Sequence, residues 1–145
     1  MATNISEFVR TEEKELVNHP AHYTHGKYEH VEVALDWRLG GLLYNCTKYI
    51  CRAGHKEGAE PTLDLRKGLW YLNKQIEFSD QENNAFGLAR QNRSIAAIDV
   101  IKDWGLGPEL SAALVLIAMT NQLSDLDMLR QAVESIELRL KELSK

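Results

Sequence analysis

The sequence predicts an all-α protein, built from two related three-helix units that pack as one helical domain. Apolar residues recur at helical spacing along most of the chain, and no segment alternates polar and apolar residues with the period of two typical of strands. Residues 31–40 (VEVALDWRLG) resemble residues 98–107 (IDVIKDWGLG) at an offset of 67 positions, which indicates one supersecondary unit used twice. The whole chain, residues 1–145, has a length that suits a single domain.

The first unit is expected at about residues 28–78. Its three helices are predicted, in order, over residues 28–38, 42–53 and 62–78. The glycine pair Gly40-Gly41 separates the first two helices, and Gly54 ends the second. Thr62 is predicted to cap the N-terminus of the third helix, because a threonine hydroxyl can accept a hydrogen bond from a backbone amide there.

The second unit is expected at about residues 94–143, after the polar stretch SDQENN. Its three helices are predicted over residues 94–104, 108–121 and 125–143. Ser124 or Asp125 is expected to cap the last helix. Ahead of both units, residues 5–17 are predicted to form a short charged helix and residues 18–27 an irregular loop.

Composition excludes several classes of protein. The net charge of −4 and the pI of about 5.7 argue against a nucleic-acid binder. The N-terminal residues lack the pattern of a signal peptide, and the apolar stretch 110–119 is too short to span a membrane. Cys46 and Cys51 match no metal or redox motif, so we expect reduced, buried thiols in a cytoplasmic protein with no membrane or nucleic-acid partner.

The two units differ on one face of their middle helices. In the first unit this face carries Asn45, Lys48, Tyr49 and Arg52. The equivalent positions in the second unit are Ala112, Val115, Leu116 and Met119. A row of lysines and arginines is often a solvated surface, but an apolar row at the same position favours an inward or pocket-facing surface. We therefore expect a site in the first unit and a degenerate scaffold in the second, unless the apolar row is the contact of a homo-oligomer.

The helical hairpin of the first unit is predicted to gather cations around one anion. The third helix has one face that carries Asp64, Lys67, Tyr71 and Lys74. Facing helices would bring Lys48, Arg52 and Lys67 close to Lys56 of the connecting loop, and several cationic donors are what a phosphate needs. An aromatic ring nearby, from Tyr49, Tyr71 or Trp70, could stack on a base.

Histidines form a second group, and its members are His19, His22, His25 and His30. The H-x2-H-x2-H spacing is a partial zinc set, but no cysteine lies near it and zinc is disfavoured. The favoured interpretation is a loop in which His19, His22 and Tyr23 close over the cationic helices, as phosphate contacts or acid–base groups. Local packing of the loop is the alternative.

Carboxylates form a third group, at Glu29, Glu32, Asp36 and Asp64. Oxygen ligands of this kind can hold Mg2+, which is the one cofactor the sequence suggests. Glu32 and Asp36 have acidic counterparts in the second unit, Asp99 and Asp103, so we expect structural roles for them. Glu29 and Asp64 are the better functional candidates.

Three stretches carry a resemblance to a known family: HPAHYTHGKYE, N-x2-KYICRAGHK and DLRKGLWYL. Over residues 18–78 the chain resembles a family of small phage-encoded proteins that includes a deoxynucleoside monophosphate kinase. The resemblance implies phosphoryl transfer to a deoxynucleotide without a Walker A loop, and no G-x4-G-K-[ST] occurs here. The motif positions are His19, His22, Tyr23, Asn45, Lys48, Tyr49, Arg52, Lys56, Asp64, Lys67 and Tyr71. The chain departs from the pattern at Gly68, inside a helix, and in its appended second unit.

These observations predict a nucleotide-binding protein of the host cytoplasm, a homo-oligomer that acts as a kinase-like phosphotransferase, with His22 or Asp64 as the proton acceptor. One alternative is a helical nucleoside triphosphate pyrophosphohydrolase that holds Mg2+ on E-x2-E and E-x2-D pairs. Glu29-x2-Glu32 fits the first pair, whereas Glu60-x3-Asp64 has the wrong spacing for the second. The other alternative is a binding protein that sequesters a nucleotide or a nucleotide-derived immune signal and needs no general base.

Overall fold

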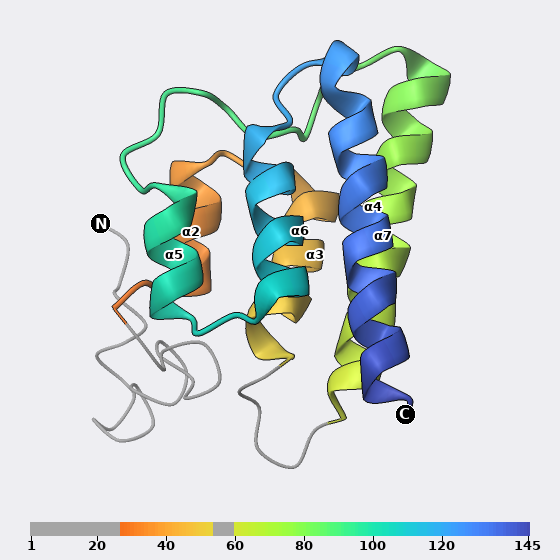
Figure 1. Cartoon of the computed structure of the whole chain (residues 1–145). Coiled ribbons are helices and arrows are strands. Elements are labelled where there is room, and N and C mark those ends of the chain that lie inside the picture. The colour runs from red at the N-terminus through yellow and green to blue at the C-terminus, as the bar shows by residue number, and fades with distance from the viewer. Residues whose placement is uncertain (1–26, 54–59) are drawn as a thin grey trace, which may run out of the picture.

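The structure is a computed structural model that describes residues 27–53 and 60–145, and this part of the chain is helical without any strand. The all-α prediction is therefore confirmed. The elements are α2 (His30–Asp36), α3 (Gly41–Arg52), α4 (Pro61–Glu82), α5 (Ala97–Asp103), α6 (Pro108–Met119), the short 3-10 helix η3 (Leu123–Asp125) and α7 (Leu126–Leu143) (Figure 1). The predicted helix over 5–17, most of the predicted loop over 18–27 and Gly54 lie outside the described residues.

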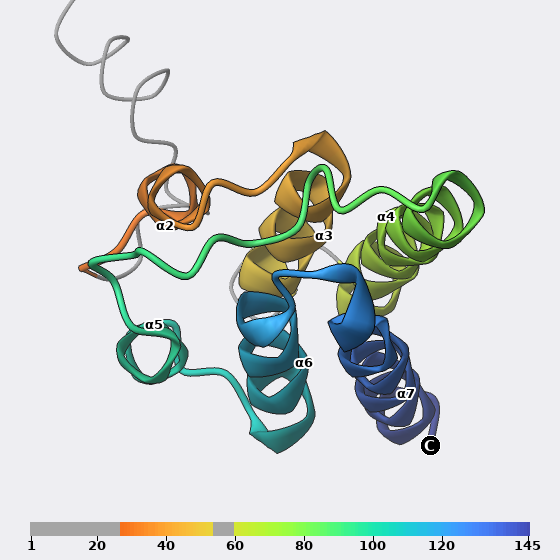
Figure 2. The same ribbon diagram turned by 90° about the horizontal axis from the view of Figure 1, so that it is seen from above.

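The longer helices pair in the order in which they follow one another in sequence. α3 packs on α4 and α6 packs on α7, and α4 also packs on α7 to join the two pairs. The short helices α2 and α5 lie side by side next to α3 and α6, as seen from both directions (Figures 1 and 2). Each half of the chain thus supplies one short helix followed by one helical hairpin.

The apolar core has two parts. The larger part lies among the four long helices and includes Leu43, Ile50, Leu72, Ile117, Leu129 and Ile136. The second part lies beneath the two short helices and includes Val33, Trp37, Cys51, Val100, Trp104 and Leu114. Both parts combine residues from the two halves, and burial against the other half supplies apolar contact that a unit of about 50 residues lacks by itself.

Two tryptophans hold the halves together through equivalent contacts. Trp37 and Trp104 have no exposed surface. Trp37 Nε1 donates to the carbonyl oxygen of Ile95 at 2.8 Å, and Trp104 Nε1 donates to that of Tyr28 at 2.8 Å. Ile95 and Tyr28 are themselves related by the offset of 67. The two tryptophans, which are also 67 positions apart, therefore occupy equivalent environments.

The aspartates that precede these tryptophans make reciprocal hydrogen bonds between the halves. The Asp36 carboxylate accepts hydrogen bonds from the backbone amides of Ser94 and Ile95, the latter at 2.8 Å. The Asp103 carboxylate accepts from the amides of Lys27 and Tyr28, each at 2.8 Å. Each aspartate orders the segment that leads into the short helix of the other half, so the structural role expected for Asp36 is confirmed.

The third helix of the first half differs from the prediction at both ends. α4 begins at Pro61 with Glu60 as its N-cap, not at Thr62, because proline has a backbone φ suited to the first helical position and no amide that needs a partner. It also continues past Phe78 to Glu82. Ser79 is buried and accepts a hydrogen bond from Gln75 Nε2 at 3.0 Å, which keeps this polar stretch helical.

Other boundaries differ less. α2 and α5 are shorter than predicted, with seven residues each. α7 has Asp125 as its N-cap, one of the two residues expected, although no side-chain cap hydrogen bond forms there.

The two cysteines are free thiols with no exposed surface, as predicted. Burial raises the pKa of Cys46 to about 12, and burial together with Asp103 raises that of Cys51 to about 12. Within the described residues, no helix has the length and apolar character needed to span a bilayer.

Candidate functional site

The α3–α4 hairpin brings the polar faces of its two helices together. Gly68 of α4 is buried against α3, where an added Cβ atom would lie 3.5 Å from Tyr49 Cβ and 3.5 Å from the carbonyl oxygen of Cys46. A residue without a side chain therefore faces Tyr49 across the hairpin. The close approach of the two helices sets the position of the Tyr49 ring.

Tyr49 is the centre of a cluster of cations. Its ring stacks on Tyr71, with centroids 6.1 Å apart and planes at 15°. Lys48 Nζ lies 4.7 Å from the Tyr49 ring centroid, and Arg52 Cζ and Lys67 Nζ each lie 5.6 Å from it. The structure thus brings together three cations and two aromatic rings that were predicted to share a site. We call these five residues the Tyr49 cluster.

Two of the three cations of this cluster lack an acidic partner in the part of the chain that the structure describes. Among the described residues, no carboxylate forms an ion pair with Lys48 or Lys67. Asp64 lies on α4 one turn before Lys67 and is buried, with 4% of its surface exposed. Its Oδ2 atom has no hydrogen-bond partner among the described residues. A buried carboxylate oxygen in this state is suited to accept a hydrogen bond or a proton from a bound molecule.

An exposed aromatic surface adjoins the cluster. Trp70 is 55% exposed and meets the Tyr71 ring edge to face, at 5.0 Å between centroids and 84° between planes. Lys74 Nζ lies 5.4 Å from the Trp70 ring centroid and 3.5 Å from Glu77 Oε2. A flat ligand group could therefore stack on Trp70 while its charged part reaches the cations.

Other predicted residues are not among those gathered around the Tyr49 ring. Asn45 Nδ2 donates to the carbonyl oxygen of Gly41 at 3.1 Å, one turn toward the start of α3. Glu29 is the N-cap of α2, and Glu32 is exposed in the first turn of that helix. The described residues contain no group of three histidine, cysteine, aspartate or glutamate side chains that could hold a metal ion. His19, His22, His25, Tyr23 and Lys56 lie outside the described residues.

His30 belongs to the core, not to the group of loop histidines in which the sequence placed it. It is 2% exposed, and its Nε2 lies 2.8 Å from Thr47 Oγ1. The Thr47 hydroxyl donates to the carbonyl oxygens of Leu43 and Tyr44, so it accepts from His30 Nε2. Burial, and next the charge of Lys48, lower the pKa of His30 to about 4. The ring is therefore neutral at physiological pH. The sequence feature that could have indicated a buried His30 is its position at the start of an amphipathic helix.

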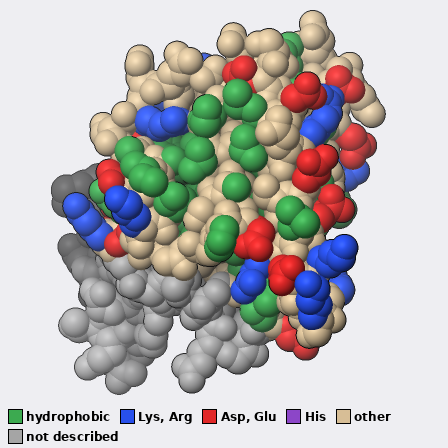
Figure 3. All heavy atoms as spheres, in the orientation of Figure 1, with side chains coloured by type: hydrophobic (Ala, Val, Ile, Leu, Met, Phe, Trp, Pro, Cys, Tyr) green, Lys and Arg blue, Asp and Glu red, His purple; other side chains and the backbone are tan. Residues whose placement is uncertain are grey.

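The apolar row of α6 is more exposed than we expected. Met119 is 47% exposed, Ala112 is exposed, and Val115 and Leu116 are half-buried. The inference that this row faces inward is wrong for Met119 and Ala112, because α6 turns these two side chains away from α7 and the core. Hydrophobic side chains gather on the face that α5 and α6 present to the viewer in Figure 3.

Comparison with protein families gave one match. Residues 17–73 are similar to a family described as protein of unknown function (DUF3310). The matched segment contains the whole Tyr49 cluster and none of the second unit. Comparison with curated proteins and with solved structures gave no match.

Proposed function

We propose that the Tyr49 cluster binds the phosphate groups of a nucleotide. The observation that carries this proposal is the placement of three cationic groups around one tyrosine ring. A guanidinium and two ammonium groups are a suitable donor set for phosphate oxygens. The chain has a net charge of −4, so this concentration of positive charge is local.

The nucleotide base would stack on the aromatic surface beside the cations. Trp70 is the most exposed ring there, and it contacts Tyr71, which in turn stacks on Tyr49. The three rings thus lead from the cations to the solvent-exposed side of α4. A nucleotide would use both the rings and the cations, because its base can stack on an aromatic ring while its phosphate contacts the cationic groups.

We further propose phosphoryl transfer to a deoxynucleoside monophosphate, which the resemblance of residues 18–78 supports. A phosphate oxygen of the monophosphate would form a new bond to the γ-phosphorus of a triphosphate donor. The bond from that phosphorus to the donor's diphosphate would break, leaving two diphosphates. Lys48, Arg52 and Lys67 would neutralise charge on the transferring group, and Asp64 would accept a proton from the monophosphate.

The direct test is nucleotide binding and turnover by the full chain. Each deoxynucleoside monophosphate is incubated with several triphosphate donors, and diphosphate is measured alongside binding by calorimetry. Lys67→Gln is expected to weaken binding about tenfold or more, because it removes a charged donor. The matched control is Lys141→Gln, at an exposed position of α7, which should leave binding unchanged.

The outcomes separate the candidate functions. If no nucleotide binds, or if Lys67→Gln and Lys141→Gln bind alike, the proposed site is wrong. Binding with recovery of unaltered ligand after denaturation would replace the kinase with a sequestering protein. Release of pyrophosphate that stops with EDTA would instead identify a pyrophosphohydrolase.

A further inference from the structure

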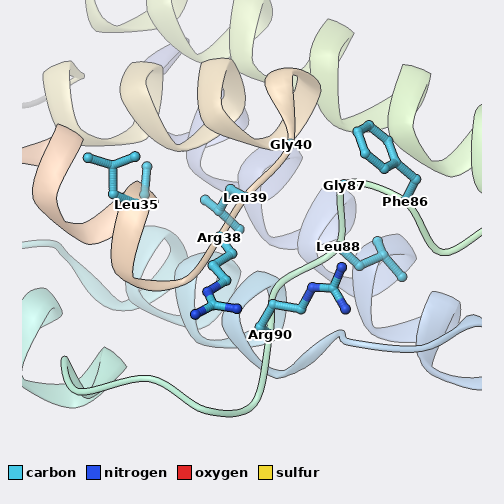
Figure 4. A pocket seen from close by; sticks show the side chains of 9 residues that line it. Leu35, Arg38, Leu39, Gly40, Phe86, Gly87, Leu88 and Arg90 are labelled. Carbon is cyan, nitrogen blue, oxygen red and sulfur yellow. The ribbon is translucent and has the colours of Figure 1, made fainter.

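A hollow lies at the opposite end of the α3–α4 hairpin from the Tyr49 cluster. It has a volume of about 360 Å³ and is lined by Leu35, Arg38, Leu39, Phe86, Leu88 and Arg90, among others (Figure 4). Its walls come from the end of α2 and the α2–α3 connection, and from the segment that follows α4. Gly40, the N-cap of α3, borders it, and Lys48, the first residue of the Tyr49 cluster along that helix, lies eight residues further on, about 12 Å at 1.5 Å per residue. The two sites are therefore separate.

Backbone hydrogen bonds fix the two walls against each other. The Gly40 amide donates to the Gly87 carbonyl oxygen at 3.0 Å, and the Arg90 amide donates to that of Trp37 at 2.9 Å. The buried Gln75 donates from Nε2 to the carbonyl oxygen of Phe86 at 3.0 Å. A Cβ atom on Gly40 would lie 2.5 Å from Gly87 Cα, so the two backbone segments are in direct contact. The hollow is thus built into the fold.

Arg38 occupies a backbone conformation that favours glycine. Its φ is 55°, in the left-handed region. The residue at the equivalent turn of the second half is Gly105, with a φ of 62°. This turn does not require a side chain, since glycine occupies the same position in the second half. A strained arginine at one of two equivalent turns indicates a role for its guanidinium group.

The hollow combines positive charge with apolar walls. Arg38 and Arg90 are exposed, no acidic residue lines the hollow, and within the described residues neither arginine has a carboxylate partner. In Figure 4, Arg38 extends from one wall toward the segment that carries Arg90. Leu35 and Phe86 are 71% and 69% exposed, which leaves a large apolar surface beside the guanidinium groups. Arginine pairs with carboxylate and phosphate through two parallel hydrogen bonds.

We propose that this hollow is a second binding site, separate from the proposed nucleotide site, for a small organic anion with a flat apolar body. The apolar body would lie against Leu35 and Phe86, and the anionic group would bind Arg38 and Arg90. The volume is sufficient for a ligand of one or two fused rings.

The test uses naphthalene-2-carboxylate as the probe and naphthalene-2-carboxamide as its neutral counterpart. Backbone amide signals of the full chain are followed by NMR during titration with each compound. The carboxylate is expected to shift the signals of Gly87 and Leu88 and to saturate with a Kd of about 1 mM, as suits a ligand of this size. The carboxamide should bind about tenfold more weakly or not at all.

Variants of Arg38 make the test specific. Arg38→Gly copies the turn of the second half, so the protein should stay folded while the preference for the carboxylate disappears. Arg66→Gln, an exposed arginine near the other end of α4, should leave that preference intact. Equal binding of the two compounds, saturable shifts confined to the Tyr49 cluster, or no saturable shift at all would each overturn the proposal.

Discussion

The two halves of the molecule share a framework and differ in chemistry. Trp37 and Trp104 make equivalent hydrogen bonds, and so do Asp36 and Asp103. The middle helices differ instead: α3 carries the cations of the Tyr49 cluster, and α6 carries an apolar row. The shared tryptophans and aspartates join the halves, whereas the cations of the candidate site lie at positions that differ. The turn formed by Arg38 or Gly105 follows the same rule.

The largest expected effect tests the shared framework. Trp37→Ala and Trp104→Ala should each lower the free energy of unfolding by about 3–5 kcal/mol, because each removes a fully buried ring. Urea denaturation followed by circular dichroism measures both losses. The comparison predicts similar values, and a difference between them above about 2 kcal/mol would show that the two halves are not energetically equivalent.

The next effect tests a difference between the halves in the core. His30 and Thr47 correspond to Ala97 and Leu114, so the second half has no titrating group there. Burial and the charge of Lys48 lower the pKa of His30 to about 4 in the folded protein, from the ordinary histidine value of 6.5 that applies in the unfolded chain. The unfolded chain therefore binds more protons between these values, and stability is retained above pH 6.5 and lost as the pH falls toward 4. The loss should be about 3 kcal/mol.

Denaturation midpoints between pH 7 and pH 4 measure this loss. Carboxylates also titrate in this range, so the control is His30→Gln, which keeps a hydrogen-bonding side chain beside Thr47 without its titration. The slope of stability against pH should be smaller in this variant. An unchanged slope would assign the acid sensitivity to other groups.

The sequence predicted regular elements better than the segments between them. Periodicity identified the helices, and the repeat identified the tryptophans as equivalent. The sequence did not identify Pro61 as the start of α4, because Thr62 is also a good capping residue. The hollow at Arg38 was also missed, since most of its wall comes from connecting segments without periodicity and the left-handed turn is occupied by an arginine.

The candidate site was predictable to the extent that it lies on helices. Spacing along α3 and α4 placed Lys48, Tyr49, Arg52 and Lys67 on facing surfaces, and the structure brings them together. Spacing does not determine how far a helix turns its face from the core. The exposure of Met119 depends on how α6 packs against α5 and α7, which the repeat could not specify.

A moderate effect tests the reciprocal hydrogen bonds of Asp36 and Asp103. Asp36→Ala and Asp103→Ala should each lower the free energy of unfolding by about 1–3 kcal/mol, because each leaves two backbone amides without their charged acceptor. Hydrogen exchange should also quicken at the amides that lose their partner: Ser94 and Ile95 in the first variant, Lys27 and Tyr28 in the second. Faster exchange at the same pair of amides in both variants would contradict the reciprocal arrangement.

The smallest effect tests the middle helices, where the halves differ most. Met119 is equivalent to Arg52, and Met119→Arg places the cation of the first half on the second. Because Met119 is 47% exposed, the change should alter the free energy of unfolding by no more than about 0.5 kcal/mol. Sedimentation of the variant and the parent protein at several concentrations tests whether the apolar row joins two copies of the chain. A monomeric variant of an oligomeric parent would make this row an interface, whereas unchanged association and stability would leave Met119 a surface residue of the scaffold half.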